Sequence, residues 1–437
     1  MSRLIQILLL IPLLFHGSVY AEDLFQIYQL AQQSDPQLKA AQNARLATLE
    51  SKPQSRALLY PTISASANTT GNRLNITQPL SVAGETYFNS NGYTLSLTQP
   101  VYHRDTYVQL RQADARVAQA DSQLAGAEQD LIIRVSGRYF DVLAAQDNLE
   151  FARAEKKAIA RELEQSQQRF DVGLVAITDV QEAQARYDQA VAQEIAAERQ
   201  LSTGRELLRE ITGQDPATLA VLGEQIPFVT PDPANIEQWT QTALMQNQQI
   251  AAAQYAAEIA REEIERQRSG HYPSVDIVGA HSYSKSGGGR FGASEADNDA
   301  VALQLNVPIY QGGLVTSRTR EAEFRHSQAR EVLEQQQRAA VRQTRDSYTG
   351  VVANISRVTA LKQAVASSKT ALESTEAGLE VGTRTQVDVL DAQRELFRAE
   401  RDHARARYDY ILETLRLKQA AGTLAPTDVE QINGWLK

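Results

Sequence analysis

Residues 172–184 read VGLVAITDVQEAQ, and residues 381–393 read VGTRTQVDVLDAQ. In each stretch a Val-Gly pair interrupts a long proline-free segment, and an Asp-Val pair follows a few residues later. Proline-free sequence of high helix propensity predicts helices on both sides, and the glycine predicts the turn between them. Each stretch therefore predicts the tip of a helical hairpin, and the chain contains this tip twice.

The repetition extends well beyond the tips. YPT at 60–62 returns as YPS at 272–274, LTQPVY at 97–102 returns as LNVPIY at 305–310, and ITG at 211–213 returns as AAG at 420–422. Similar stretches at a constant offset mark a duplicated structural unit. We therefore divide the chain into a leader (1–21), a first repeat (22–216), a linker (217–234), a second repeat (235–424) and a C-terminal tail (425–437).

The composition excludes several classes of function. The 437 residues include 44 basic and 53 acidic side chains, for a net charge of -9, and no cysteine. An acidic balance argues against nucleic acid as a partner, and a chain without cysteine has no disulfide, thiol nucleophile or zinc–thiolate site. The sequence has no metal-ligand spacing, nucleophile elbow or phosphate loop. We therefore expect no enzymatic activity, no cofactor and no metal.

The first residues resemble a secretion signal. Arg3 precedes an apolar run at 4–15, and the small residues up to Ala21 predict cleavage before Glu22. The alternative, a membrane anchor, needs about 20 apolar residues. This run is shorter and contains Pro12, so we expect a cleaved signal peptide at residues 1–21.

Each repeat contains two segments with alternating side chains. These segments lie at 62–69 and 94–100 in the first repeat, and near 275–277 and at 301–307 in the second. The alternation predicts two β-strands per repeat and four per chain. Four strands cannot close a barrel, since closure takes about eight or more. The edges of this sheet must therefore pair with other chains.

Long helices are predicted to follow the strands. A helix over residues 105–171 would be about 100 Å long, and its apolar residues recur every seven positions, which is typical of a left-handed supercoil. Lys156 interrupts that apolar stripe. The returning helices, 178–211 and 387–421, are shorter and end before Gly213 and Gly422. An ordinary antiparallel coiled coil is an alternative interpretation of this periodicity.

Three stretches resemble the TolC family of outer-membrane exit ducts: RFDVGLVAITDV at 169–180, PIYQGG at 308–313 and GTRTQVDVLDA at 382–392. The resemblance covers essentially all of the chain from residue 22. It implies a mainly α fold with a β-barrel portion, in which a homotrimer forms a 12-stranded outer-membrane β-barrel continued by a long α-helical barrel in the periplasm. Segments 23–58 and 235–268 would stack end to end on the returning helices.

The resemblance also implies a function and partners. It implies a channel for tripartite efflux or type I secretion, opened at its periplasmic tips when a periplasmic adaptor (membrane fusion) protein and an inner-membrane ABC, RND or MFS transporter recruit it. Outer-membrane lipid would surround the barrel. The alternative is a periplasmic coiled-coil adaptor or structural protein. Such a protein would have one hairpin, whereas this chain has two, each preceded by strands.

Two aspartates of the second tip are candidates for a pore constriction. Asp388 and Asp391 stand three residues apart, so their carboxylates project from nearly one face of a helix. Threefold repetition would form two carboxylate rings, which would favour cations and raise the carboxylate pKa by crowding like charges. The resemblance implies that both residues line the inner constriction. The alternative for Asp388 is helix capping.

The resemblance implies a gate link in which Arg384 reaches Thr178 and Asp179 of a neighbouring hairpin. Such a charge-assisted link would break when the gate opens. A second link in the family uses a tyrosine at the position of Leu379, and leucine cannot make that hydrogen bond. We therefore expect the closed gate of this protein to depend more on Arg384.

The turns of the two tips match the motifs with which the family meets adaptor hairpins. Glycine at such a turn permits close approach of another backbone. Its simpler role is to turn the chain, and the two roles are compatible. The candidate docking residues are Val172, Gly173, Leu174, Val381, Gly382 and Thr383.

Overall fold

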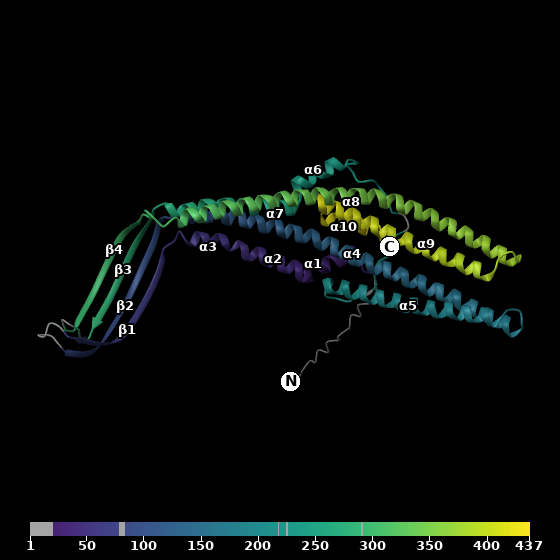
Figure 1. Ribbon diagram of the computed structural model, residues 1–437, viewed down its shortest axis with the longest axis horizontal. Helices are drawn as coiled ribbons and strands as arrows, with labels where there is room; N and C mark the ends of the chain where they lie inside the picture. Colours follow the sequence, from purple (N-terminus) through teal and green to yellow (C-terminus); the bar gives the residue numbers. More distant parts are fainter. Residues whose placement is uncertain (1–20, 78–83, 217, 224–225, 290–291) are drawn as a thin grey trace, which may run out of the picture.

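The computed structural model describes residues 21–77, 84–216, 218–223, 226–289 and 292–437. Residues 1–20 lie outside the described residues, and almost all of the predicted signal peptide lies there with them. The molecule is elongated, with a β-sheet at one end and two helical hairpins that extend to the other (Figure 1). Within the described ranges, no helix has both the length and the apolar character needed to cross a membrane.

The sheet has four antiparallel strands in chain order: β1 (Thr62–Ile76), β2 (Gly84–Tyr102), β3 (Ser274–Ser286) and β4 (Ser294–Asn306). The predicted four strands are confirmed, but they are longer than the alternating segments of the sequence. The ladder continues through polar pairs such as Asn72 with Phe88 and Arg73 with Tyr87. Backbone hydrogen bonds do not require alternating apolar side chains, so they extend the strands beyond the alternating segments. β1 and β4 form the two edges.

Close to the helices the two faces of the sheet differ in polarity, whereas further along the strands the same apolar face also carries His281 and Asp299, which lie 2.8 Å apart. One row across the strands, on the apolar face, consists of Ile63, Leu97, Gly279 and Val301. The adjacent row, on the opposite face, consists of Ser64, Ser96, Ala280 and Ala300. In the single chain, Val301 is 84% exposed and Leu303 is 71% exposed. An exposed apolar face of this kind marks a surface that contacts lipid or another chain.

Each repeat contains a long helix and a shorter returning helix. The first hairpin consists of α4 (Arg104–Asp171) and α5 (Ile177–Thr212), and the second consists of α8 (Leu314–Glu380) and α9 (Gln386–Ala421). Both hairpins are confirmed, and α4, α5 and α9 begin one residue before their predicted starts. Lys156, which interrupts the apolar stripe of α4, forms an ion pair with Glu194 of α5.

The helices that precede the strands are segmented. Residues 23–58, expected as one helix, form α1 (Leu24–Ser34), α2 (Pro36–Leu49) and α3 (Ser51–Ala57). Residues 235–268 form α6 (Ile236–Gln246) and α7 (Gln248–Arg268), and a short 3-10 turn, η2 (Ser269–His271), follows α7. Two of the three breaks fall at Asp35 and Asn247, whose side chains cap the next helix, and the third falls at Glu50, which makes no side-chain cap. Asp and Asn favour capped starts over a helix interior, which explains the breaks at Asp35 and Asn247.

These breaks receive the ends of the returning helices. Gly422 ends α9 with a φ of 79°, and a Cβ there would lie 2.2 Å from the carbonyl oxygen of Gln246. Gly213 ends α5 in the same way, close to Ser34. Only glycine fits the contact at Gly422, because a side chain would overlap backbone. The returning helices therefore stack end to end on the helices that lead into the strands.

The main apolar core lies midway along the helices. It includes the fully buried rings of Tyr139 and Phe140, and Phe140 stacks on Tyr408 of α9 with centroids 5.4 Å apart. The segment after α5 and the C-terminal tail also pack here. Leu222 bridges to Leu436, which follows α10 (Pro426–Asn433). The segments that join and end the two repeats thus enclose this core.

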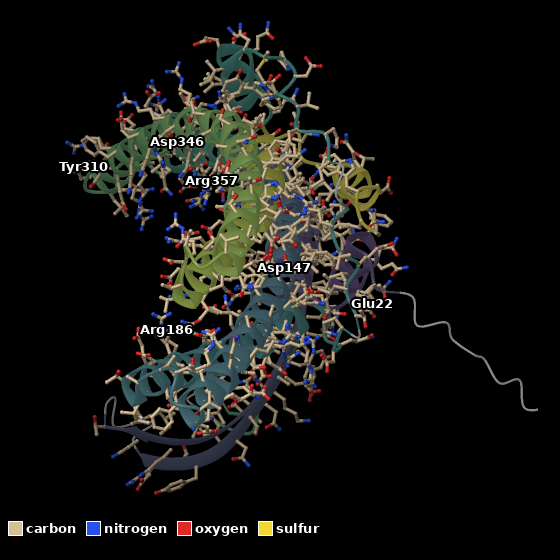
Figure 2. All side chains as sticks on the ribbon, turned by 90° about the vertical axis from the view of Figure 1, so that its right-hand side faces the viewer. Glu22, Asp147, Arg186, Tyr310, Asp346 and Arg357 are labelled. Atoms are coloured by element: carbon tan, nitrogen blue, oxygen red, sulfur yellow. The ribbon has the colours of Figure 1, made fainter. Side chains whose placement is uncertain are left out.

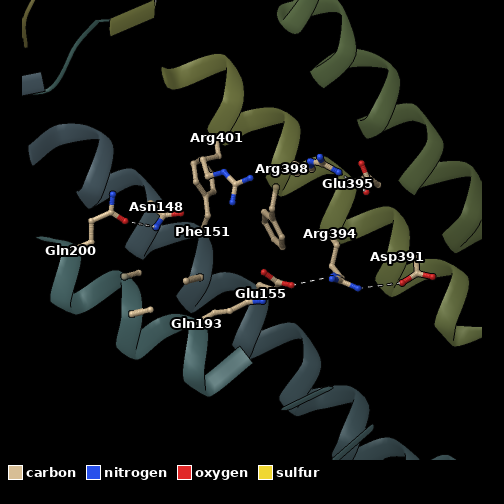
Figure 3. Close-up of a pocket in the computed structure, with 14 residues that line it drawn as sticks. Asn148, Phe151, Glu155, Gln193, Gln200, Asp391, Arg394, Glu395, Arg398 and Arg401 are labelled. Atoms are coloured by element: carbon tan, nitrogen blue, oxygen red, sulfur yellow. Dashed lines mark hydrogen bonds and ion pairs between the residues drawn. The ribbon is translucent and has the colours of Figure 1, made fainter. Parts of the chain in front are cut away.

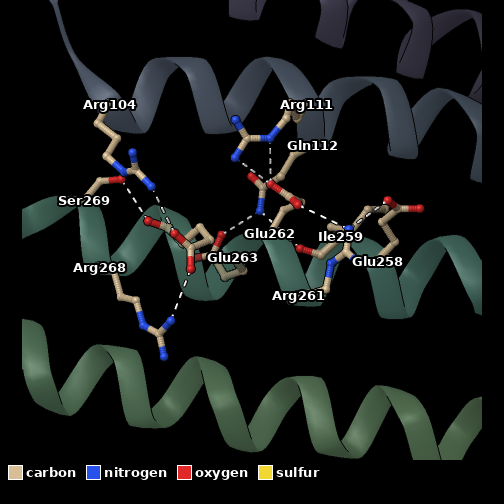
Figure 4. A network of polar contacts seen from close by, with 11 residues as sticks. Arg104, Arg111, Gln112, Glu258, Ile259, Arg261, Glu262, Glu263, Arg268 and Ser269 are labelled. Atoms are coloured by element: carbon tan, nitrogen blue, oxygen red, sulfur yellow. Dashed lines mark hydrogen bonds and ion pairs between the residues drawn. The ribbon is translucent and has the colours of Figure 1, made fainter.

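A network of ion pairs joins the helices next to the sheet (Figure 4). Arg104 of α4 contacts Glu265 of α7 at 3.2 Å, and Glu263 accepts hydrogen bonds from Arg266 and from Gln112 of α4. Burial alone would raise the pKa of Glu263, but these hydrogen bonds and one from Gln267 lower it to about 2. Carboxylates with several donors stay ionised at neutral pH. The network therefore fixes α4 against α7 where the helices meet the sheet.

Candidate gate at the helical tips

Both tips turn by the same hydrogen-bond pattern. At the first, Gly173 N–H donates to the carbonyl of Phe170 and Leu174 N–H donates to that of Arg169, each at 2.8 Å. At the second, Gly382 and Thr383 donate to Leu379 and Gly378. The two glycines have φ values of 75° and 77°. This is the Schellman motif, in which a glycine in the left-handed region satisfies the last carbonyls of the helix.

The apolar residues around these glycines project into solvent. Val172 is 69% exposed, Leu174 is 75% exposed and Val381 is 75% exposed. A Cβ added to Gly173 or Gly382 would meet nothing within 4 Å. The positive φ therefore requires glycine for the turn, and open space surrounds both turns. The predicted docking residues thus lie on accessible apolar tips, while the docking itself stays a prediction.

Asp388 takes part in a capping box at the start of α9. Its carboxylate accepts hydrogen bonds from the backbone N–H and the hydroxyl of Thr385, both at 2.8 Å. These bonds, with the nearby charge of Arg384, lower the pKa of Asp388. The capping role is therefore present in the single chain, and the direction of the pKa is opposite to that expected for a crowded ring. The rise expected from three neighbouring copies stays a prediction.

Asp391 lies one turn further along α9. Its Oδ1 lies 3.8 Å from Nη1 of Arg394, which contacts Glu155 of α4 at 3.2 Å through Nε. Glu155 and Arg394 are not among the site residues predicted from the sequence. A signal was present, because Arg394 is three residues after Asp391, a spacing that places oppositely charged side chains together on a helix. The contact across to Glu155 depends on how the two hairpins pack.

The predicted gate residues lie on different hairpins and are not joined within one chain. Asp179 accepts a hydrogen bond from the backbone of Ala176 at 3.3 Å, and Thr178 contacts Asp179 at 3.5 Å. For the side chains that the structure describes, no hydrogen bond or ion pair connects Arg384 to either residue. Leu379 is half-buried on α8. A link through Arg384 would therefore have to reach another subunit.

A cavity of about 740 Å³ lies between the hairpins above the tips (Figure 3). Its lining includes Phe151 of α4 and Phe397 of α9, whose ring centroids are 6.4 Å apart, together with Asp391 and Arg394.

Further from the tips, the hydroxyl of Tyr408 donates to Asp147 at 2.8 Å, and burial raises the pKa of Asp147. Viewed from the tip end, the two hairpins lie on either side of this region, the first marked by Arg186 and the second by Arg357 (Figure 2). The described residues include no cluster that could hold a metal ion.

A family model described as "Outer membrane efflux protein" matches residues 27–214 and 239–423. The chain belongs to the outer membrane efflux protein family. The two matched ranges each contain one of the hairpins and its two strands. Alignments with known proteins cover nearly the whole chain. The outer membrane protein TolC of Vibrio cholerae serotype O1 is 42% identical over 424 residues, covering 96% of this chain and 95% of the relative.

Further relatives and one solved structure also match nearly the whole chain. TolC of Escherichia coli K12 is 35% identical, with coverage of 100% of this chain and 90% of the relative. The alkaline protease secretion protein AprF of Pseudomonas aeruginosa is 30% identical, with coverage of 96% and 88%. The solved CmeC outer membrane channel of Campylobacter jejuni superimposes with a TM-score of 0.79 at 15% identity, over 95% of this chain and 90% of that one. The expected TolC-like fold is therefore confirmed.

Proposed function

We propose that this protein is an exit duct of the outer membrane, formed by three copies of the chain. One observation carries the proposal: a four-stranded sheet with two unpaired edges and an exposed apolar face continues directly into two long helical hairpins. Three such sheets supply twelve strands, enough to close a barrel and remove its edges. The apolar face then meets outer-membrane lipid, and the helices extend the wall into the periplasm.

The relatives support the location and the kind of transport. Two are named as outer membrane proteins, and AprF is named for the secretion of alkaline protease. The duct serves efflux or type I secretion, with its barrel in the outer membrane and its helical tube in the periplasm. The cargo passes through and is not transformed, so the protein is a channel and has no enzymatic activity. The periplasmic adaptor alternative is without support, because these relatives align along the full chain with its two hairpins and four strands.

The tips contact the adaptor that recruits the duct, and the transporter bound to that adaptor supplies the energy. The exposed apolar turns around Gly173 and Gly382 suit the hairpin ends of a periplasmic adaptor protein. The adaptor joins the duct to an inner-membrane ABC, RND or MFS transporter. The acidic balance of the chain argues against nucleic acid as a partner.

The residues of the second tip carry the gate. Arg384 pairs with Thr178 and Asp179 of the neighbouring subunit in the closed state, and this charge-assisted link breaks on opening. Asp388 and Asp391 of three subunits form the constriction, where carboxylate rings select cations. Capping by Asp388 is compatible with this role, because capping fixes the position of the carboxylate.

Fractionation and electrophoresis test the proposed function. The protein should be recovered in outer-membrane fractions and should migrate in unheated detergent samples as a species of three chains that boiling converts to one. Recovery as a soluble periplasmic monomer would reject the duct. A trimer that fails to restore drug resistance or protein secretion to a strain without its own duct would reject the transport role.

A further inference from the structure

Arg394 is shared between carboxylates of the two hairpins. Its Nε lies 3.2 Å from Oε1 of Glu155 on α4, and its Nη1 lies 3.8 Å from Oδ1 of Asp391 on its own helix (Figure 3). The first contact crosses between hairpins, and the second stays within α9. The two carboxylates compete for one cation, and Glu155 holds it at the shorter distance.

Apolar packing near these ion pairs holds the two hairpins together. Leu390, next to Asp391, is only 5% exposed and packs in one cluster with Ile159 of α4 and Ala190 of α5. This contact holds α9 against the first hairpin close to the tip, without a contribution from the charges. The Glu155–Arg394 pair therefore forms only while the hairpins are packed together, and it responds to their separation.

We propose that Arg394 is a charge switch that couples the spacing of the hairpins to the ion selectivity of the duct. This inference rests on the proposed function. While the hairpins are packed, Glu155 draws Arg394 away and Asp391 keeps its negative charge available to the pore. When the hairpins separate, Glu155 moves out of reach and Arg394 turns to Asp391. The carboxylate ring is then neutralised, and its preference for cations falls.

The ion pairs of Arg394 are weak enough for a switch. Arg394 is about half exposed, and exposed ion pairs are weak enough for one partner to replace another. The guanidinium carries several donors on one planar group, so it can turn between carboxylates on two helices without losing its charge. Three copies act on the same ring, so small changes in each subunit combine in the pore.

Single-channel recordings of the purified trimer in planar bilayers under a KCl gradient test the switch. Arg394→Gln should leave the K⁺ to Cl⁻ permeability ratio of the resting duct close to that of the wild type, because Glu155 already draws Arg394 away from Asp391. Glu155→Gln should lower the ratio by about two- to threefold, because Arg394 moves to Asp391. In the Arg394→Gln background, Glu155→Gln should have no further effect.

The double variant separates the switch from a simple field effect. If Glu155→Gln lowers the ratio equally in both backgrounds, Glu155 acts as a fixed charge and the inference is wrong. Arg357→Gln is the matched control: Arg357 is also about half exposed and pairs with Asp409 within the second hairpin, so the ratio should not change. A wild-type protein that forms no pore would contradict the proposed function itself, whereas a conducting, cation-selective wild type whose ratio is unaltered by Glu155→Gln would contradict only the switch.

Discussion

Asp35 and Arg134 form a two-pronged ion pair that ties the start of α2 to the middle of α4. Nη1 of Arg134 donates to Oδ1 at 3.1 Å, and Nη2 donates to Oδ2 at 2.7 Å. The Asp35 side chain is 3% exposed and also caps α2 at Leu38. Burial would raise the pKa of Asp35, but the hydrogen bonds from Arg134 and from the Leu38 backbone lower it. The pair therefore holds a helix break that receives the end of α5.

Arg134→Met should reduce the free energy of unfolding by about 2–3 kcal/mol, because it leaves a buried carboxylate without its counter-ion. Arg338→Met is the control, since the ion pair of Arg338 with Glu334 lies at the surface. It should change stability by less than about 0.5 kcal/mol. Thermal unfolding of the detergent-solubilised protein measures both, and equal effects would contradict the assigned role of the Asp35 pair.

Acid should weaken the joint between the tube and the sheet. The pKa of Glu263 is about 2 in the folded protein against an ordinary value of 4.5. A depressed carboxyl pKa contributes stability above pH 4.5, and that stability is lost as the pH falls from 4.5 to about 2. With allowance for solvent screening we expect a loss of about 1–2 kcal/mol over this window. Melting temperature against pH should fall less steeply in Glu263→Gln than in the wild type, and parallel curves would refute the assignment.

The closed gate should depend on Arg384. Arg384→Ser should raise single-channel conductance several-fold, because it removes the charged partner of Thr178 and Asp179 in the neighbouring subunit. Leu379→Tyr should have the opposite effect, since a phenolic hydroxyl there could donate a hydrogen bond to Asp179. Unchanged conductance in Arg384→Ser would show that the gate is held elsewhere.

Loss of the two carboxylates at the second tip should abolish cation preference. Asn at 388 can still accept the Thr385 hydrogen bonds that begin α9, so the helix start is retained while the charge is removed. The Asp388→Asn/Asp391→Asn variant should therefore conduct with a permeability ratio near unity. Asp346→Asn, near the middle of α8 and many turns from its tip end, should retain the wild-type ratio. Equal ratios in all three proteins would place the constriction outside Asp388 and Asp391.

Adaptor docking should fail when both tip glycines gain side chains. Asn tolerates the positive φ of Gly173 and Gly382 better than other residues, so Gly173→Asn/Gly382→Asn should keep the turns while filling the open space around them. Export by cells with this variant should be lost although trimers still form. Normal export would limit the glycines to turning the chain, and loss of the trimer would show that the substitution acts on folding.

The order of the elements could be predicted from the sequence because its signals are local. Proline-free segments predicted the long helices, and the Val-Gly pairs predicted the tips, where a single glycine at positive φ makes the turn. Strand length was underestimated, because polar pairs such as Asn72 with Phe88 extend a ladder without alternation. The breaks at Asp35 and Asn247 were missed, although each residue is a good helix cap.

The candidate gate was predictable in part. Asp388 and Asp391 were recognised from spacing and resemblance, and the capping role of Asp388 was among the alternatives. The pairing of Arg394 with Glu155 could not be predicted, because residues more than 200 positions apart meet only through the packing of α9 on α4. The contact of Gly422 with Gln246 was hidden for the same reason.

In the proposed duct, three copies of this chain enclose one pore. Planar-bilayer recording of the purified wild-type protein, taken from a gel-filtration peak whose mass equals three mature chains, tests it most directly. We predict discrete, long-lived and cation-selective current steps from that peak. A trimer peak without current steps, or steps that arise only from a monomer peak, would contradict a pore shared by three chains.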